Sequence, residues 1–460
     1  MGILERRRAD AYVKAASIAD MEHVTGVVEL PDVHFKPGME APSSIVVGSR
    51  RITPHYVSES INDGMGVVVT DLHIDEVGPE VVEGILTYLN VHGVKRKNHQ
   101  GRYSWDEDQV LRVCHEGAKV VVESRGLDDQ GRAESLLESM EDGGVAWERP
   151  LTADDVRAHV PGFLLGSPVS RGETGLNFGG NHFAEVQAVT DVLDQTLADR
   201  LDLSPGQLVV MYHLGPGPLG SILSNLSAFR EKPPIHRKAG YGLGRLLLHS
   251  RRGLSFLNTF GLPRRWLAVD PDSPEGEHLA TVLAIIKNYG YAYRMTTVAA
   301  VIDAVAEATG RDRSRSSLLV DCSHNILQPE KVGGDDLWVS RHNCCRVIPE
   351  FPGIVAGSHQ VSSCLTVGPE EDPGELAGYD HGIGFLLDLM EERGEPPVPH
   401  PSGVSSVRLK MKRGHNEIVE RRTFPLLGSE PILETIKELE QMNAVRGAVL
   451  TRPVGTLKHV

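Results

Sequence analysis

Cysteine is scarce and scattered in this chain of 460 residues. The five cysteines are Cys114, Cys322, Cys344, Cys345 and Cys364. Their number is odd, and no two of them form a CxxC pair. The sequence therefore predicts neither a disulfide framework nor a zinc site built from cysteines.

Long apolar runs are also missing. The longest, such as Leu208–Met211 and Val67–Val69, are far shorter than the roughly 20 residues that a membrane-spanning helix needs. The start of the chain, Met1–Arg6, has no apolar signal region and no serine or threonine at position 6 for a myristoylation signal. We therefore predict a cytoplasmic protein.

Positive charge is in deficit, with 47 lysines and arginines against 62 acidic residues and a net charge of −15. This balance argues against non-specific binding to long nucleic acids. It does not exclude a local basic groove that binds the end of a nucleic-acid strand. The hydrophobic content of 40% and charged content of 24% are ordinary for a globular protein.

The hydrophobic patterning favours an α+β fold with mixed β-sheets flanked by helices, in one domain spanning 1–460. The polar stretch 124–175 is a candidate insertion or lid. Helices are expected at 76–95, 106–123, 183–202, 277–310 and 430–443, and strands at 66–69, 208–212, 317–321 and 448–450.

Three histidines lie where chain direction changes. His213 closes a predicted strand, His324 follows another, and His182 follows a glycine-rich turn. Strand ends hold side chains rigidly, and imidazole is a good ligand for Mn, Fe or Zn. Each histidine alone is more simply explained as structural or surface-exposed, and no HExxH motif is present. A metal site is thus one interpretation, beside a structural role and an exposed surface position.

Two further segments invite both a structural and a functional interpretation. Asp63 lies in an Asn-Asp-Gly sequence, which favours a turn over a metal ligand. His381 precedes two glycines, Gly382 and Gly384, which permit close approach of a phosphate. A histidine nucleophile needs a group that orients its ring, and Asp32 is a candidate for that role.

Nine segments taken in order resemble the RtcB RNA ligases. They correspond to that family's PDVH, DIGCGM, GGGNHFxE, metal-histidine, NYAxANR, HN, PGSMGTSS, HGAGR and RPxxxxKG segments. In this chain they are Pro31–Gly38, Ser60–Met65, Phe178–Glu185, His213, Asn288–Arg294, His324–Asn325, Ala356–Ser363, His381–Phe385 and Arg452–Lys458.

The resemblance implies GTP and one or two Mn²⁺ ions as cofactors, with Asp63, His182, His213 and His324 as metal ligands. It implies that His381 accepts GMP and that Asp32 orients it. Implied contacts to the nucleotide are Asn181, His182, Phe183, Ala184, Glu185, His324, Asn325, Ala356, Gly357, Ser358, His359, Ser363, His381, Gly382, Ile383, Gly384 and Lys458.

The implied reaction joins an RNA 3′-phosphate or 2′,3′-cyclic phosphate to a 5′-hydroxyl through a GMP–histidine intermediate. The implied partners are ends of tRNA or damaged RNA, together with an archease-like activator. Metal ions suit such chemistry because they neutralise the triphosphate and polarise phosphorus.

The chain departs from the family pattern at several charged positions. Asp63 replaces the bridging cysteine, and Ser60 replaces an aspartate. Gly215–Gly220 contains no arginine, Phe385 replaces the arginine of HGAGR, and His342 replaces a cation. Each lost arginine removes a bidentate phosphate donor. These losses leave three alternatives open: a guanylyltransferase for another phosphorylated substrate, a metal-dependent phosphohydrolase, or a non-catalytic regulator that binds GTP or an RNA end.

Overall fold

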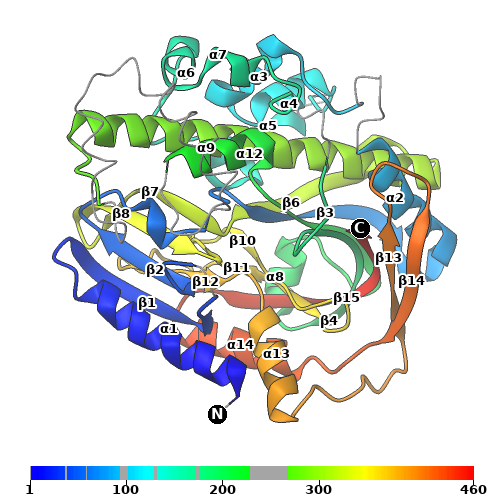
Figure 1. Ribbon diagram of the computed structural model, residues 1–460. Coiled ribbons are helices and arrows are strands. Elements are labelled where there is room, and N and C mark those ends of the chain that lie inside the picture. Colours follow the sequence, from blue (N-terminus) through cyan, green and yellow to red (C-terminus); the bar gives the residue numbers. More distant parts are fainter. Residues whose placement is uncertain are drawn as a thin grey trace.

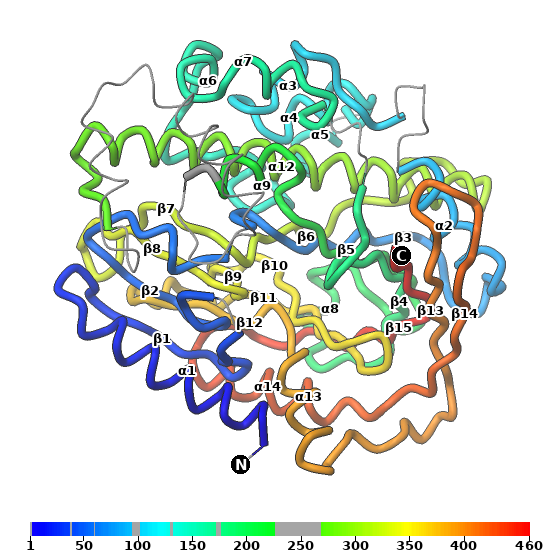
Figure 2. The backbone as a smooth tube through the Cα atoms, viewed as in Figure 1, coloured from blue at the N-terminus to red at the C-terminus, as the bar shows by residue number. Residues whose placement is uncertain are grey.

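A computed structural model describes residues 2–36, 39–58, 60–93, 102–128, 132–171, 176–227 and 268–460. Figures 1 and 2 show the arrangement of the elements, with the long helix α12 (Pro274–Thr309) crossing the molecule above the sheets. Pro37 and Gly38 of the PDVH-like segment, together with residues 129–131 and 172–175 of the candidate lid, lie outside the described residues.

Two larger sheets and one small sheet form the β-structure of the described chain. The first sheet has the order β1 (Val24–His34), β2 (Ser43–Ser49), β8 (Asp335–His342), β7 (Asn325–Val332). The second has the order β10 (Pro352–Val355), β11 (Ser363–Val367), β15 (Arg446–His459), β4 (Phe183–Val192), β5 (Gln207–Leu214), β3 (Gly64–His73), β6 (Ser316–Ser323). A hairpin of β13 (Ser405–Met411) and β14 (Ile418–Pro425) joins it beside β15, and β9 (Cys344–Cys345) pairs with β12 (Tyr379–Asp380).

Most strand pairs are antiparallel, but β13 runs parallel to β15, so the large sheet is mixed as predicted. The helices are α1 (Ile3–Ala19), α2 (Pro79–His92), α3 (Glu107–Glu116), α4 (Lys119–Ser124), α5 (Arg132–Glu138), η4 (Glu141–Gly144), α6 (Ala153–His159), α7 (Gly162–Leu165), α8 (Gln195–Arg200), α9 (Gly217–Ser227), α12, α13 (Gly384–Arg393) and α14 (Glu430–Gln441). The predicted α+β class is therefore confirmed.

The helix α12 begins and ends at residues suited to those positions. The Ser273 side chain accepts a hydrogen bond from the Gly276 backbone at the start, where Pro274 occupies the first turn. Gly310 closes the helix with a left-handed φ of 70°. Side chains are buried all around most of its length because helices α2, α3, α4 and α9 and strands β3 and β6 all contact it.

The prediction of a helix over 183–202 is wrong for its first half. That half forms β4, and a helix, α8, starts only at Gln195. β4 lies between β5 and β15, and its residues Ala184–Val189 are buried on both faces. A strand buried on both faces loses the polar alternation that identifies strands, so Val186, Val189 and Val192 mimicked helical spacing.

The described part of the candidate lid, 124–175, forms α5, η4, α6 and α7. Figure 1 shows α6 and α7 at the top of the molecule, beyond α12, whereas η4 contacts β6 through the hydrogen bond of 2.8 Å from the Ser323 backbone to Glu141 Oε2. Whether the segment moves as a lid stays a prediction. Among the described residues, no helix combines the length and apolar character needed to cross a membrane.

Candidate active site

Four strands of the large sheet bring their ends to one edge. β4, β5, β3 and β6 lie side by side in that order, each antiparallel to the next. β4 and β3 therefore begin at the edge where β5 and β6 end. His182 precedes β4, Asp63 precedes β3, His213 lies at the end of β5, and His324 follows β6. The strand order thus gathers four side chains that are far apart in sequence.

The side chains at this edge lie within reach of a common ion. The potential ligand atoms of Asp63, His182 and His213 all lie within 4.8 Å of one another, and so do those of His213, His324 and His381. His182 Nε2 is 3.5 Å from Asp63 Oδ2, and the Nε2 atoms of His213 and His324 are 3.2 Å apart. The two groups share His213.

The chemistry of these donors fits a divalent cation. Asp63 Oδ1 and His324 Nδ1 are buried and have no hydrogen-bond partner among the described residues, although buried polar atoms normally have one. Burial, and then neighbouring histidine charges, hold the pKa values of His213 and His324 well below their ordinary range. Their rings are therefore neutral and offer lone pairs. Several imidazoles with one carboxylate suit Mn, Fe or Zn.

A buried network holds the turn that carries Asp63. Asn62 adopts a left-handed φ of 65°, and its carbonyl accepts a hydrogen bond of 2.5 Å from Arg294 Nη1. Arg294 is fully buried and also pairs with Asp321 at 2.8 Å. Gly64 permits this approach, because a Cβ there would lie 2.7 Å from the guanidinium carbon of Arg294. The backbone on both sides of Asp63 is thereby fixed.

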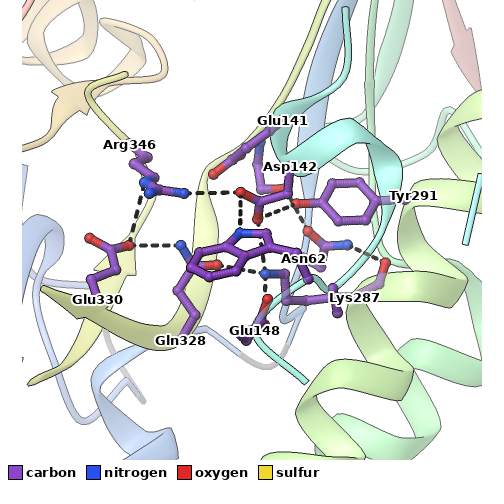
Figure 3. Close-up of polar contacts among 12 residues, drawn as sticks. Asn62, Glu141, Asp142, Glu148, Lys287, Tyr291, Gln328, Glu330 and Arg346 are labelled. Carbon is purple, nitrogen blue, oxygen red and sulfur yellow. Dashed lines mark hydrogen bonds and ion pairs between the residues drawn. The ribbon is translucent and has the colours of Figure 1, made fainter. Parts of the chain in front are cut away.

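The same turn is anchored to α12. Figure 3 shows Asn62 beside the α12 residue Lys287, whose backbone carbonyl accepts a hydrogen bond of 2.8 Å from Asn62 Nδ2. The ammonium of Lys287 in turn contacts Asp142 at 3.0 Å and Glu148 at 2.8 Å. Asp142 lies in η4, so the candidate lid, α12 and the Asp63 turn form one connected polar cluster.

His381 is held in a defined tautomer. Its Nδ1 lies 2.7 Å from the backbone carbonyl of Asn343, which can only accept a hydrogen bond, so Nδ1 carries the proton. Burial lowers the pKa of His381 to about 4, so the ring is neutral near pH 7. Its ring stacks on His324 with centroids 4.4 Å apart. Nε2 therefore presents a lone pair beside the metal-ligand candidates.

Asp32 has a different position from the one expected. It was predicted to orient the His381 ring, but the partner of that ring is the Asn343 carbonyl. Asp32 Oδ1 instead accepts a hydrogen bond from the Leu386 backbone, and the Asp32 backbone donates to Asp380 Oδ2. Burial, and then the charge of Asp380, raise the pKa of Asp32. Asp32 thus supports the chain on both sides of His381 and makes no direct contact with the ring among the hydrogen bonds described.

A separate cavity of about 160 Å³ lies beside the metal-ligand cluster. It is lined by Phe183, Glu185, Ala356, Gly357, Ser358, His359, Ser363, Arg408, Thr456 and Lys458. Eight of these were predicted nucleotide contacts. The cavity is smaller than the roughly 300–1,000 Å³ of sites that enclose whole small ligands, so it suits one ring system of a larger ligand.

The polar groups of this cavity are held by hydrogen bonds. Glu185 is buried and accepts hydrogen bonds from Gln187 Nε2 at 2.7 Å and from the Thr456 hydroxyl. Burial raises the pKa of Glu185 to about 7. Lys458 Nζ donates to the carbonyls of Gly180 and His182 at 3.0 and 2.8 Å, which fixes the loop before β4.

Other predicted nucleotide contacts lie elsewhere. The side chains of Ala184 and Ile383 belong to the hydrophobic core, so only their backbones are available to a ligand. Asn325 accepts a hydrogen bond from the Asn343 backbone and so helps to place the carbonyl that holds His381. Asn181 is exposed in the loop before β4, and Gly382 bridges to Ala356.

Phe385, which departs from the family pattern, and Arg341, the neighbour of the departing His342, both have structural partners here. Phe385 stacks on His34 with centroids 4.3 Å apart. Arg341, beside His342, forms a buried two-point ion pair with Glu330 at 2.5 and 2.9 Å. Neither position supplies a free cation to the sheet edge.

Sequence reasoning missed three contributors: Asn343, Arg294 and Arg408. Asn343 acts through its backbone carbonyl, which leaves no signal in residue type. Arg294 ends the NYAxANR-like segment, so its position was visible but its contact with Asn62 was not. Arg408 reaches the cavity from the β13–β14 hairpin, which no motif marked.

The α+β fold and this edge define a class of protein with a histidine-rich candidate metal centre next to a candidate nucleotide pocket. The chain belongs to the RtcB family, whose profile, described as tRNA-splicing ligase RtcB, matches residues 14–391.

Individual relatives agree with this assignment. The chain is 26% identical over 411 residues to the tRNA-splicing ligase RtcB of Archaeoglobus fulgidus, and the aligned region covers 84% of this chain and 78% of that protein. It is 27% identical over 453 residues to the RNA-splicing ligase RtcB of Mycobacterium tuberculosis, which covers 93% and 94% of the two chains.

Proposed function

We propose that this protein is an RNA ligase that uses GTP and Mn²⁺ to join an RNA 3′-phosphate or 2′,3′-cyclic phosphate end to a 5′-hydroxyl end. The observation that carries the proposal is the geometry of His381: a neutral imidazole, protonated at Nδ1, whose Nε2 lies among the metal-ligand candidates. Membership of the RtcB family supports an RNA ligase, and the names of its relatives refer to tRNA and RNA splicing.

In the proposed first step, Nε2 of His381 attacks the α-phosphorus of GTP. A bond forms between nitrogen and phosphorus, the bond to the bridging oxygen breaks, and pyrophosphate leaves. The carbonyl of Asn343 keeps the Nδ1 proton in place and stabilises the positive charge that develops on the ring. When bound, Mn²⁺ neutralises phosphate charge and polarises phosphorus.

The residues that would hold Mn²⁺ are Asp63, His182, His213 and His324. The carboxylate of Asp63 is a harder ligand than thiolate and remains suitable for Mn²⁺. The cavity beside them would hold the base, with Phe183 as an aromatic surface and Glu185 as a hydrogen-bond acceptor.

In the later steps, GMP passes from His381 to an RNA 3′-phosphate, and a 5′-hydroxyl attacks that activated end and releases GMP. A 2′,3′-cyclic phosphate is first opened by water to the 3′-phosphate. Ends of tRNA or damaged RNA are the proposed substrates, an archease-like protein the proposed activator, and the cytoplasm the proposed location.

One observation favours a second candidate. The absence of an arginine at Phe385 and the engagement of Arg341 with Glu330 remove cations from the places where RNA phosphates would bind. A guanylyltransferase for another phosphorylated molecule would keep the GTP-dependent step of the proposed reaction and lose the steps that involve RNA. A phosphohydrolase would need the metal ligands but not the His381 nucleophile, and a regulator would need neither reaction.

The test is a joining assay with two short RNAs, one ending in a 2′,3′-cyclic phosphate and the other beginning with a 5′-hydroxyl. The proposal predicts a joined product that requires GTP and Mn²⁺ and disappears in His381→Ala. Hydrolysed 3′ ends without joining would favour the phosphohydrolase. His415→Ala, which changes an exposed histidine outside the site, is the matched control.

A further inference from the structure

The β13–β14 hairpin lies beyond residue 391, where the match to the family profile ends, yet it borders the candidate nucleotide cavity. β13 pairs in parallel with β15, the strand that carries Lys458. Through this pairing the hairpin contributes one side chain, Arg408, to the lining of the cavity.

The register of the strands explains why Arg408 points there. Glu185 lies opposite Thr456, Thr456 opposite Arg408, and Arg408 opposite Arg422. Residues directly opposite each other share one face of a sheet. One row across β4, β15, β13 and β14 therefore runs from the buried carboxylate of Glu185 to two arginines.

Arg408 carries a donor that has no partner. Its Nε is buried and makes no hydrogen bond among the described residues, and only 18% of its side chain is exposed. The guanidinium lies 4.7 Å from the centroid of Phe424 and 3.6 Å from Glu420, while Arg422 lies 4.6 Å from the same ring. The contact with Glu420 is an ion pair, which offsets the repulsion between the two opposed arginines, and it leaves Nε of Arg408 as a donor without an acceptor.

The cavity is the place for a base, not for the phosphates. None of the metal-ligand candidates lines it, and neither does His381. A nucleotide with its α-phosphate at His381 would direct its base toward Phe183. The ammonium of Lys458 uses two of its three N–H donors on the backbone carbonyls before β4, whereas Nε of Arg408 makes no hydrogen bond among the described residues.

We propose that Arg408 determines base specificity by donating hydrogen bonds to N7 and O6 of guanine. The inference rests on the proposed function, because it requires a guanine nucleotide in this cavity. A guanidinium group can donate two hydrogen bonds side by side, and this geometry matches the neighbouring acceptors N7 and O6 of guanine. Adenine has an amino donor in place of O6, so the same fork opposes it.

The test measures competition of GTP, 7-deaza-GTP and ATP against a fluorescent GTP analogue for the full chain with Mn²⁺. 7-Deaza-GTP lacks the N7 acceptor and is otherwise GTP. The wild type is expected to bind GTP about 5- to 150-fold more tightly than ATP, the range of one good arginine–guanine pair. It is also expected to bind GTP several-fold more tightly than 7-deaza-GTP.

In Arg408→Gln the advantage of GTP over 7-deaza-GTP should fall to within about twofold, a difference near the limit of such assays, whereas Arg408→Lys, whose ammonium can also donate to guanine, should retain part of the advantage. Arg408→Lys keeps the charge beside Phe424 and so separates lost recognition from lost folding. Arg421→Gln is the matched control, since Arg421 is exposed on the same hairpin and pairs with Glu83.

Two results overturn the inference in different ways. If the wild type binds GTP but the Arg408 variants weaken GTP and 7-deaza-GTP equally, Arg408 does not read N7 and the proposed function is unaffected. If the wild type binds no guanine nucleotide, the proposed function fails and this inference fails with it.

Discussion

Replacing Lys287 by methionine should destabilise the protein strongly. The Lys287 side chain is 1% exposed, and its ammonium contacts Asp142, Glu148 and Gln328 at 3.0, 2.8 and 2.6 Å (Figure 3). Methionine fills similar space but leaves two carboxylates without this partner. Asp142 keeps its ion pair with Arg346 at 3.0 Å, whereas Glu148 loses the one hydrogen bond that its side chain makes among the described residues.

The expected loss is about 3–5 kcal/mol, the usual consequence of removing one partner from a buried ion pair. For a chain of 460 residues each kcal/mol lowers Tm by roughly 1 °C, so thermal denaturation should show a decrease of roughly 3–5 °C. Adding Glu148→Gln to the variant should restore part of the loss, because it removes the unpaired charge.

The matched control is Lys331→Met. Lys331 pairs with Asp336 at 3.8 Å, but both side chains are about 80% exposed, so no measurable shift is expected. If Lys287→Met and Lys331→Met change Tm equally little, the buried cluster does not stabilise the fold as described.

Two further predictions concern charge at buried positions. Burial, and then Asp142, raise the pKa of Glu141 from an ordinary 4.5 to about 7, so its contribution to stability is fully present below about pH 4.5 and is lost as the pH rises through 7. Glu141→Gln should therefore flatten the decrease of Tm between pH 5 and 8, and an unchanged profile would contradict the assignment. Asp63→Asn should weaken Mn²⁺ binding in calorimetry by at least about tenfold, since even outer contacts of a metal site have effects of that size. Equal affinity in Asp63→Asn and in the exposed control Asp336→Asn would exclude Asp63 as a ligand.

The sequence predicted those elements whose signals are local. α12 carries a long apolar pattern with a capping serine, and the apolar runs of β5 and β6 identified them as strands. β4 was misjudged because it is buried between two neighbours and lacks alternation. This segment forms a strand because it pairs with β15, which lies more than 250 residues later in the sequence.

The sequence pointed to candidate residues for the site but not to its geometry. Motifs pointed to His182, His213, His324 and His381, but their approach depends on the strand order β4-β5-β3-β6. Spacing in sequence does not contain that order. The orienting role for His381 was assigned to Asp32 from the resemblance of its PDVH segment, whereas in the structure the His381 ring donates a hydrogen bond to the backbone carbonyl of Asn343.

The central claim is that His381 becomes covalently bound to GMP. The most direct measurement incubates the protein with Mn²⁺ and GTP labelled at the α-phosphate, denatures it, and measures the label that remains on the chain. The account predicts acid-labile label on the wild type and on His415→Ala, and none on His381→Ala. A folded, metal-bound wild type without label, or label that persists in His381→Ala, would contradict it.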